Sequence, residues 1–108
     1  MNVALGEFEH LVLLAVLRLE ERAYAPAILD EIESRTGRPA SRGSIYVTLD
    51  RLEEKGLLQS EMEAGGATRG GRPRRRVMLT ASGLASLRET RAALLRMWQG
   101  VEEGLSHA

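Results

Sequence analysis

The stretch ASRGSIYVTLDRLEEKGLL, residues 40–58, gives the clearest indication of the fold. Ser41 suits the start of a helix, because its hydroxyl can accept a hydrogen bond from a free backbone N–H group. Three apolar residues then recur at steps of three and four: Ile45, Leu49 and Leu52. Gly56 stands where helices commonly end on a left-handed residue. The pattern predicts a helix over residues 42–55 with one buried face.

Two further helices are predicted ahead of this stretch. The first covers residues 6–21 and has a wide apolar face. Its apolar residues are spaced by three and four: Phe8, Leu11, Val12, Ala15, Val16 and Leu19. The second runs from Pro26, which suits a first helical turn, to Thr36, and Gly37 ends it.

The chain after Gly56 changes to a strand-like pattern. Residues 57–63 and 74–80 alternate moderately between apolar and polar side chains, which predicts two strands. The connection between them is rich in glycine and too long for a tight turn. We therefore expect a hairpin with a long tip.

A last helix is predicted to begin at Thr80, whose hydroxyl suits an N-cap. A seam of residues at alternating steps of three and four follows: Leu84, Leu87, Arg91, Leu94, Trp98, Val101 and Leu105. Such a heptad seam normally faces another helix. Gly100 lies within it, and we expect this glycine to bend the helix or to end it early.

The order of these elements predicts a mainly α (α+β) fold, a winged helix-turn-helix followed by a C-terminal dimerisation helix. Residues 1–80 are expected to form the DNA-binding domain and residues 81–108 the dimerisation helix, within a single compact unit. In this arrangement the third helix enters the major groove of DNA and the second crosses the backbone behind it.

The formal net charge of zero conceals an uneven distribution. Residues 1–33 hold seven acids and two arginines, whereas residues 64–80 hold five arginines and no acid. The basic part is the stretch GGATRGGRPRRR, residues 65–76. Most charge runs are simply solvated, but a solvated surface normally mixes both signs. The missing acids therefore favour an anionic partner, and the predicted fold makes that partner DNA.

We expect the wing arginines to make two kinds of DNA contact. Arg72 and Arg74 lie on a narrow, extended backbone and suit an A·T-rich minor groove. Arg69, Arg75 and Arg76 are expected nearer the phosphates. A nucleotide-binding loop is disfavoured, because neither G-K-[ST] nor G-x-G-x-x-G occurs in this stretch.

The outward face of the predicted third helix is small and polar near its start. From the helical spacing, Gly43, Val47 and Asp50 should point away from the core. The DNA-contact candidates here are Ser41, Arg42, Ser44, Tyr46, Val47 and Arg51. Polar side chains and free N–H groups at the helix start suit phosphate oxygens, and Arg51 suits a phosphate or a guanine edge. In the alternative interpretation the two serines only cap the helix and Arg51 pairs with a glutamate.

Two motifs in the same register resemble the PadR family of bacterial transcriptional regulators. They are GSIYVTLDRLEEKGLL, residues 43–58, and GRPRRRVMLTASGLASL, residues 71–87. The resemblance implies a dimeric, DNA-binding winged helix, and the short C-terminal part resembles the subgroup with a single dimerising helix. Val47 departs from the family pattern, which usually has proline there. Met62 replaces a common aromatic, and a longer basic run replaces wing aromatics.

Trp98 is the only tryptophan of the chain and occupies a position in the heptad seam. Packing at a helix interface is the simpler interpretation. The resemblance adds an alternative, because some small PadR-like repressors hold flat aromatic effectors between the last helices of a dimer. The residues expected at this dimer interface and effector pocket are Phe8, Leu11, Leu87, Leu94, Met97, Trp98 and Val101.

Composition excludes other classes of function. The 108 residues suit one domain, and the longest uncharged apolar run is far shorter than the roughly 20 residues a bilayer span needs. Cysteine is absent and the N-terminus has no secretory pattern, so we expect a cytoplasmic protein. His10 and His107 have no Cys or acid at metal-ligand spacing. No catalytic residue, metal site or cofactor is predicted.

These observations together predict a homodimeric repressor that binds a palindromic operator in double-stranded DNA and is released by a small hydrophobic aromatic effector. One rival is a winged-helix module in which the basic wing binds an acidic protein partner in place of DNA. A second rival is a sequence-tolerant packaging protein, although packaging needs charge more than a fit to the groove.

Overall fold

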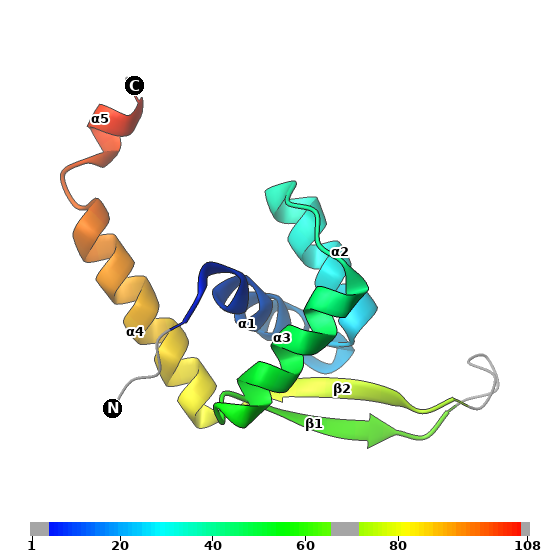
Figure 1. The fold of residues 1–108 in the computed structure, drawn as a ribbon. Helices are drawn as coiled ribbons and strands as arrows, with labels where there is room; N and C mark the ends of the chain where they lie inside the picture. Colours follow the sequence, from blue (N-terminus) through cyan, green and yellow to red (C-terminus); the bar gives the residue numbers. More distant parts are fainter. Residues whose placement is uncertain (1–4, 66–71, 107–108) are drawn as a thin grey trace.

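The computed structural model describes residues 5–65 and 72–106. Three helices come first: α1 (Glu7–Leu19), α2 (Ala25–Thr36) and α3 (Arg42–Glu54), with a short 3-10 turn, η1 (Glu20–Arg22), after α1. A hairpin of β1 (Leu58–Glu63) and β2 (Arg74–Leu79) follows, called the wing below. Two helices end the chain, α4 (Ala81–Trp98) and α5 (Glu102–Ser106). Figure 1 shows this arrangement, and it confirms the predicted winged helix-turn-helix.

The core lies where α1, α2 and α3 meet the base of the wing. Its largest fully buried side chains come from all of these elements: Val12, Leu13, Ile28, Ile45, Leu49, Leu52, Leu57 and Val77. The three predicted residues of the α3 stripe are among them. Burial of such side chains contributes roughly 1.5–3 kcal/mol each. The apolar periodicity therefore located both the helices and the core.

The wing is an antiparallel pair whose register places Leu58 opposite Leu79 and Glu63 opposite Arg74. A further contact was not predicted from sequence. Tyr24, just before α2, forms an isolated antiparallel bridge with Arg76 of β2, and the Val77 amide donates to the Ala23 carbonyl at 3.0 Å. The wing is therefore bonded at its base to the start of α2.

The joint between the wing and α4 explains the sequence LTASG, residues 79–83. The Thr80 hydroxyl accepts from the Gly83 amide at 3.0 Å, which caps α4, and donates to the Gly56 carbonyl at 2.6 Å. A Cβ on Gly83 would lie 2.1 Å from the Leu57 carbonyl oxygen. Position 83 therefore requires glycine, because α4 lies so close to the backbone at Leu57, between α3 and β1, that no side chain fits.

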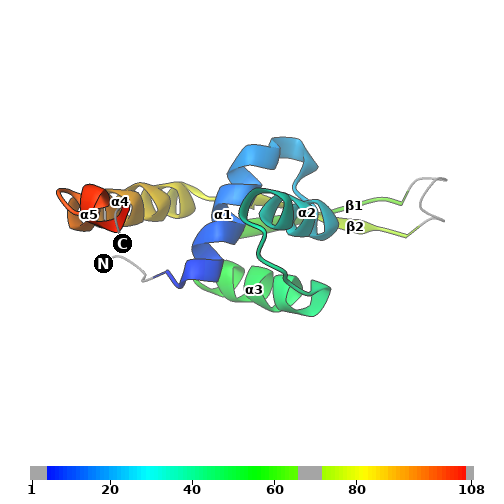
Figure 2. The same cartoon turned by 90° about the horizontal axis from the view of Figure 1, so that it is seen from above.

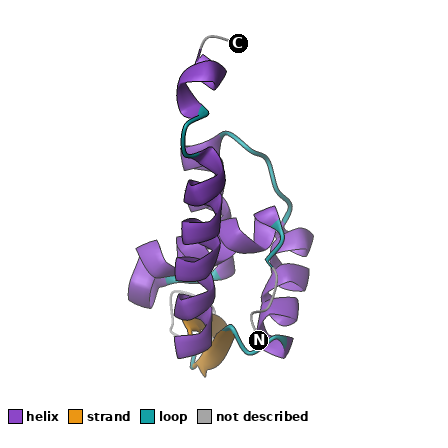
Figure 3. Cartoon of the chain, turned by 90° about the vertical axis from the view of Figure 1, so that its left-hand side faces the viewer, coloured by secondary structure: helices purple, strands orange, loops and turns teal. Residues whose placement is uncertain are grey.

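The C-terminal part differs from the predicted single helix. α4 ends at Trp98, and Gly100 adopts a left-handed backbone with a φ of 85°. A separate helix, α5, follows the break, as Figure 3 shows. The heptad seam thus continues in sequence to Leu105 but not in a single helix. Gly100 ends the helix because it adopts this left-handed conformation without a steric penalty.

The two ends of the molecule carry different elements. The wing and the N-terminus of α3 extend toward one side, and α4 leaves the three-helix body toward the other (Figures 1 and 2). The first two turns of α4 pack against the core, with Leu87 only 5% exposed. Residues 93–105 are all exposed.

Candidate nucleic-acid interface

The exposed face of α3 is the one expected from its helical spacing. Gly43, Val47 and Asp50 are exposed, while Thr48 joins the apolar stripe in the interior. Tyr46 and Val47 are 45% and 56% exposed, so two large side chains stand on the surface of this helix. The outward face therefore offers apolar and aromatic contacts beside its small N-terminal residues.

The start of α3 is closed by a reciprocal cap between two serines. The Ser41 hydroxyl accepts from the Ser44 amide at 3.0 Å, and the Ser41 amide donates to the Ser44 hydroxyl at 3.2 Å. The Ser44 hydroxyl in turn donates to the Ser41 carbonyl at 2.8 Å. Its proton is thus committed within the cap, whereas the Ser41 hydroxyl proton is left to donate to a phosphate oxygen.

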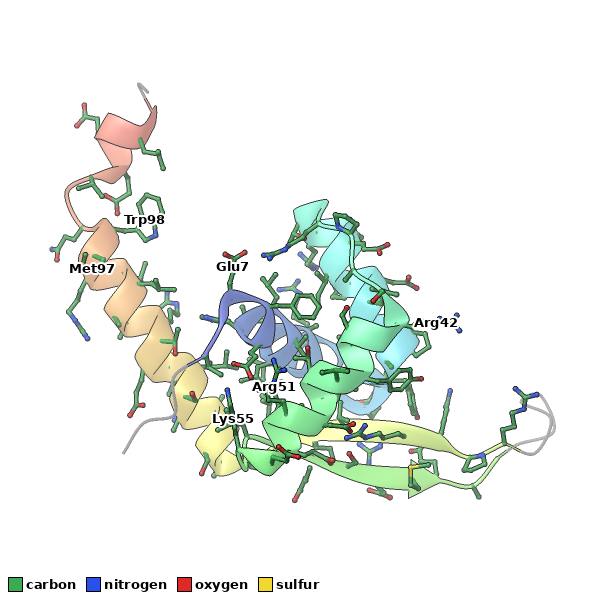
Figure 4. All side chains as sticks on the ribbon, viewed as in Figure 1. Glu7, Arg42, Arg51, Lys55, Met97 and Trp98 are labelled. Atoms are coloured by element: carbon green, nitrogen blue, oxygen red, sulfur yellow. The ribbon has the colours of Figure 1, made fainter. Side chains whose placement is uncertain are left out.

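The two arginines of α3 lie at opposite ends of the helix. Arg42 is in the first turn and projects on the side toward which the wing extends, whereas Arg51 lies nearer Lys55 (Figure 4). Both are exposed. Arg51 also contributes to the electrostatic field that favours the charged form of Glu9 on α1. Arg42 therefore lies at the end of α3 that faces the same side as the wing, and Arg51 lies near the other end of the helix.

The outer face of the wing pairs arginines with acids from the opposite strand. Arg76 is bonded to Glu61 at 3.0 Å and to Glu63 at 3.1 Å, and Arg74 lies 3.5 Å from Glu63. The Arg74 guanidinium also stacks 3.7 Å from the centroid of the Tyr24 ring. The strand register places these opposite charges directly across from each other, which stabilises the hairpin.

Tyr24 completes this cluster. Its hydroxyl donates to Glu63 at 2.5 Å. This hydrogen bond raises the pKa of the Tyr24 hydroxyl. Together with the hydrogen bond from Arg76, it holds the pKa of the Glu63 carboxyl below its usual value. The basic run of β2 is therefore balanced locally by acids that the sequence places more than ten residues earlier.

Arg75 points to the other face of the wing, toward α3. Its guanidinium is bonded to Asp50 at 2.9 Å and to Glu53 at 2.6 Å, and its side chain is only 19% exposed. This geometry does not favour the predicted phosphate contact of Arg75, because two carboxylates already neutralise its charge and little of its side chain reaches solvent. Arg72 is exposed and has no acidic partner within the described part of the chain. Arg69 lies outside the described residues.

A hollow of about 660 Å³ lies between α3, the start of α2 and the wing. Tyr46 of α3, Pro26 of α2, and Met62, Pro73 and Arg74 of the wing are among its lining residues. We call it the wing hollow. The recognition helix and the wing thus border one concave surface, as a shared DNA-binding face requires.

Comparison with known proteins agrees with this architecture. Residues 13–89 match the family described as "Transcriptional regulator PadR-like family". The chain belongs to that family. The PadR-like assignment also confirms that the protein is not an enzyme, because the members of this family are transcriptional regulators.

Relatives of this PadR-like protein are found by sequence and by structure. A transcriptional regulator of Mycobacterium tuberculosis is 43% identical over 74 residues, which are 68% of this chain and 65% of that protein. A PadR family regulator from Eggerthella lenta has a similar structure, with a TM-score of 0.70 and 34% identity over 92% of this chain and 86% of that one.

The same fold occurs in Bacillus subtilis PadR in complex with operator DNA. The TM-score is 0.64 at 18% identity, and the match covers 80% of this chain and 47% of that one. At this identity the likeness concerns the fold alone.

The end of the PadR-like chain opposite the wing is apolar. A groove of about 480 Å³ runs between α1 and α4, and we call it the α1–α4 groove. It is lined on α1 by His10, Leu14 and Leu17, and on α4 by residues that include Leu87, Leu94 and Trp98. Burial lowers the pKa of His10 there, which favours its neutral form.

The predicted effector pocket is only partly assembled by these residues. Leu87, Leu94 and Trp98 line the α1–α4 groove, whereas Phe8 and Leu11 pack against the core instead. Met97 is 79% exposed and projects from α4, and Val101 follows the helix break. These four residues therefore do not line the α1–α4 groove, and their place in a dimer interface stays a prediction.

The search for other kinds of site gives two results. The described residues contain no cluster of three or more His, Cys, Asp or Glu side chains placed to hold a metal ion. Within the same ranges, no helix combines the length and the apolar character that a bilayer crossing needs.

Proposed function

We propose that this protein is a homodimeric transcriptional repressor that binds a two-fold-symmetric operator in double-stranded DNA. The main support is that the exposed face of α3 and the wing border one hollow on the side away from α4. A dimer built at the α4 end would then present two such faces to the same duplex. Half-sites about one helical turn apart would match this symmetry.

Within this proposal α3 occupies the major groove. Arg42 and the Ser41 hydroxyl, together with the free N–H groups of the first turn, bind phosphates. Ser44 supports them through the cap. Tyr46 lines the wing hollow and binds the flanking backbone, and exposed Val47 packs against a base edge such as a thymine methyl. Arg51 binds a phosphate farther along the helix.

The wing provides the minor-groove contacts. Arg72 is the leading candidate, because it is exposed and has no acid beside it among the described residues. Arg74 is 43% exposed and would exchange its weak contact with Glu63 for the DNA. Arg69 belongs to the same proposal from its sequence position. A narrow minor groove attracts such side chains strongly.

Dimerisation is assigned to residues 81–108, through the apolar surface of α4 and the adjoining exposed leucines of α1. Leu94, Leu95 and Trp98 of α4 are each more than 40% exposed, and Leu14 and Leu17 of α1 stand beside them. Covering this surface with a second copy removes apolar area from water. We also expect a cytoplasmic location, because a regulator of this kind must reach chromosomal DNA.

A small hydrophobic aromatic molecule is the proposed effector. The α1–α4 groove has a suitable volume, and Trp98 offers a ring on which a flat ligand can stack. Release from DNA requires that the ligand bind one arrangement of the dimer better than the other. Because Trp98 is the only tryptophan, its fluorescence reports directly on this site. Titrations in which no aromatic compound quenches Trp98 would leave it a packing residue.

The DNA-binding proposal is tested by fluorescence anisotropy with two duplexes, one from the region upstream of the gene and one of random sequence. Tighter binding to the upstream duplex supports the repressor. Equal binding to both selects a packaging protein, and no binding selects a module for an acidic protein partner. A dimer that neutralises roughly 6–10 phosphates should lose about three to five orders of magnitude in affinity between 50 and 200 mM salt.

A further inference from the structure

Arg75 occupies a three-element junction that the basic run of the sequence does not indicate. Its Nε donates to the Ser60 hydroxyl of β1 at 2.8 Å. Its Nη1 donates to Asp50 at 2.9 Å and its Nη2 to Glu53 at 2.6 Å, both on α3. The Ser60 hydroxyl also bonds to Glu53. One guanidinium therefore joins both strands of the wing to the recognition helix.

The donor geometry of arginine suits this role. A guanidinium presents its N–H groups in a rigid fork, so it holds two carboxylates at fixed positions, which an ammonium does not. Bonds to Ser60, Asp50 and Glu53 use all three nitrogens of the fork. A phosphate could be reached only by the two remaining N–H groups, one on each Nη, of a side chain that is 19% exposed, whereas Arg72 is exposed.

The position of Asp50 gives these bonds a second consequence. Asp50 is 68% exposed at its side chain and lies on the outward face of α3 with Val47. A carboxylate on a face that approaches DNA repels phosphates unless a positive charge neutralises it. The ion pair with Arg75 supplies that charge and fixes the direction of the carboxylate.

Arg75 also lies where the wing separates from α3. It lines the wing hollow together with Tyr46 of α3 and Pro73 of the wing. Val77, two residues toward the base, is fully buried in the core, whereas Met62, opposite Arg75 in the register, is 62% exposed. The bonds of Arg75 thus lie between the buried base of the wing and its exposed outer part. They join the two sides of the wing hollow.

We propose that Arg75 is a positioning residue that holds the wing at a fixed angle to the recognition helix and masks Asp50, and that it does not contact DNA itself. This inference rests on the proposed DNA-binding function. It makes Glu53 and Asp50, two acids on a DNA-binding helix, contributors to specific binding.

The test uses Arg75→Lys and Glu53→Gln, with Arg18→Lys, a surface arginine of α1 outside the proposed DNA-binding face, as the matched control. The readout is the ratio of affinities for the upstream duplex and a random duplex at one salt concentration, because a change in net charge affects both duplexes alike. Arg75→Lys removes the fork of donors, and Glu53→Gln removes one of the carboxylates that it holds. Each change should lower the affinity ratio about tenfold and leave the salt slope unchanged. Arg18→Lys should leave both quantities near those of the parent protein.

The opposite interpretation predicts different results. If Arg75 binds a phosphate, Arg75→Lys retains the affinity ratio, and Glu53→Gln strengthens binding by releasing the guanidinium. Arg75→Gln would then lower the salt slope by about one for each protomer. Any of these outcomes would overturn the positioning role.

A second measurement separates this inference from the function on which it rests. Amide hydrogen exchange of residues 74–79 in the free protein should become several-fold faster in Arg75→Lys and Glu53→Gln than in the Arg18→Lys control. Unchanged exchange would refute the positioning role even if the protein binds DNA. If exchange becomes faster but neither duplex is bound, the wing–helix link is retained and the proposed DNA binding fails.

Discussion

The wing end and the α4 end of this protein differ in whether their side chains have partners within the same chain. At the wing, Arg74, Arg75 and Arg76 all have acidic partners within the same chain. At the other end, Leu94 and Trp98 line an open groove, and the two residues are 48% and 41% exposed. The difference teaches that the charged surface is organised within one chain, whereas the apolar surface is left open, as the proposed dimer requires.

The strongest test of this contrast is at the joint between the two ends. Gly83→Ala places a Cβ 2.1 Å from the Leu57 carbonyl oxygen, so α4 or the backbone at Leu57 must move. We expect the free energy of unfolding to fall by about 3 kcal/mol, because an overpacked site of this kind must shift backbone. Urea unfolding measures the change. Gly104→Ala, where the added Cβ meets nothing within 4 Å, is the control and should change little.

A charge in the apolar surface should disrupt the proposed dimer. Leu94→Glu would place a carboxylate in the α1–α4 groove, where a partner copy would desolvate it, so the dimer should dissociate about 100-fold more readily. Sedimentation equilibrium measures the dissociation constant. Arg96→Glu changes charge on another side of α4 and serves as the comparison. A parent protein that stays monomeric at high concentration would refute the assignment of this surface.

The wing end is tested by removing its exposed arginine. Arg72→Gln should weaken DNA binding by about 1 kcal/mol for each protomer and lower the salt slope by about one, because it removes a minor-groove cation without disturbing an ion pair. Anisotropy titrations at several salt concentrations give both numbers. Arg18→Gln, which loses only a surface contact with Glu31, should bind as the parent does. Equal losses in the two variants would indicate a general charge effect.

The smallest expected effect concerns the link between α1 and α3. Glu9 is bonded to Lys55 at 2.7 Å. Its burial raises the pKa, but hydrogen bonds from Lys55 and the Gly6 amide, with the nearby Arg51, outweigh burial and hold the pKa of Glu9 below its usual 4.5. A lowered pKa stabilises the fold above about pH 4.5, and this stabilisation is lost as the pH falls through the folded-state value.

Glu9→Gln should therefore cost about 1 kcal/mol of stability near pH 7 and progressively less in acid. Urea unfolding at neutral pH and near pH 3 measures the difference, and Glu54→Gln on the exposed side of α3 is the control. A cost that stays constant with pH would mean that Glu9 contributes by packing alone.

The fold was predictable from sequence because its main determinants are local. Ser41 and Thr80 cap the helices that follow them, as their positions indicated. Gly100 was expected to bend or end the last helix, and the structure ends α4 two residues before it. The apolar spacing of α1 and α3 found the core in the same way.

The candidate site was less predictable because it depends on strand register. Glu61 and Glu63 are opposite Arg76 and Arg74 only once the hairpin pairs in one alignment. The acid-free run in the sequence therefore suggested a more positive wing than the structure has. Glu61 and Glu63 occur at alternate positions of the first predicted strand, and an arginine run begins the second strand. These two patterns together could have indicated the ion pairs. No pattern in the sequence indicated the backbone bridge between Tyr24 and Arg76.

The close approach at Gly83 has a mechanical consequence. The first turn of α4 is in contact with the backbone at Leu57, and Thr80 is bonded to Gly56, so the start of this helix and the root of the hairpin form one rigid lever. In the proposed dimer, its long arm would project toward the second subunit and its short arm toward the duplex. A small tilt between the paired long arms would then be carried to both hairpins at once, without any change inside the three-helix body.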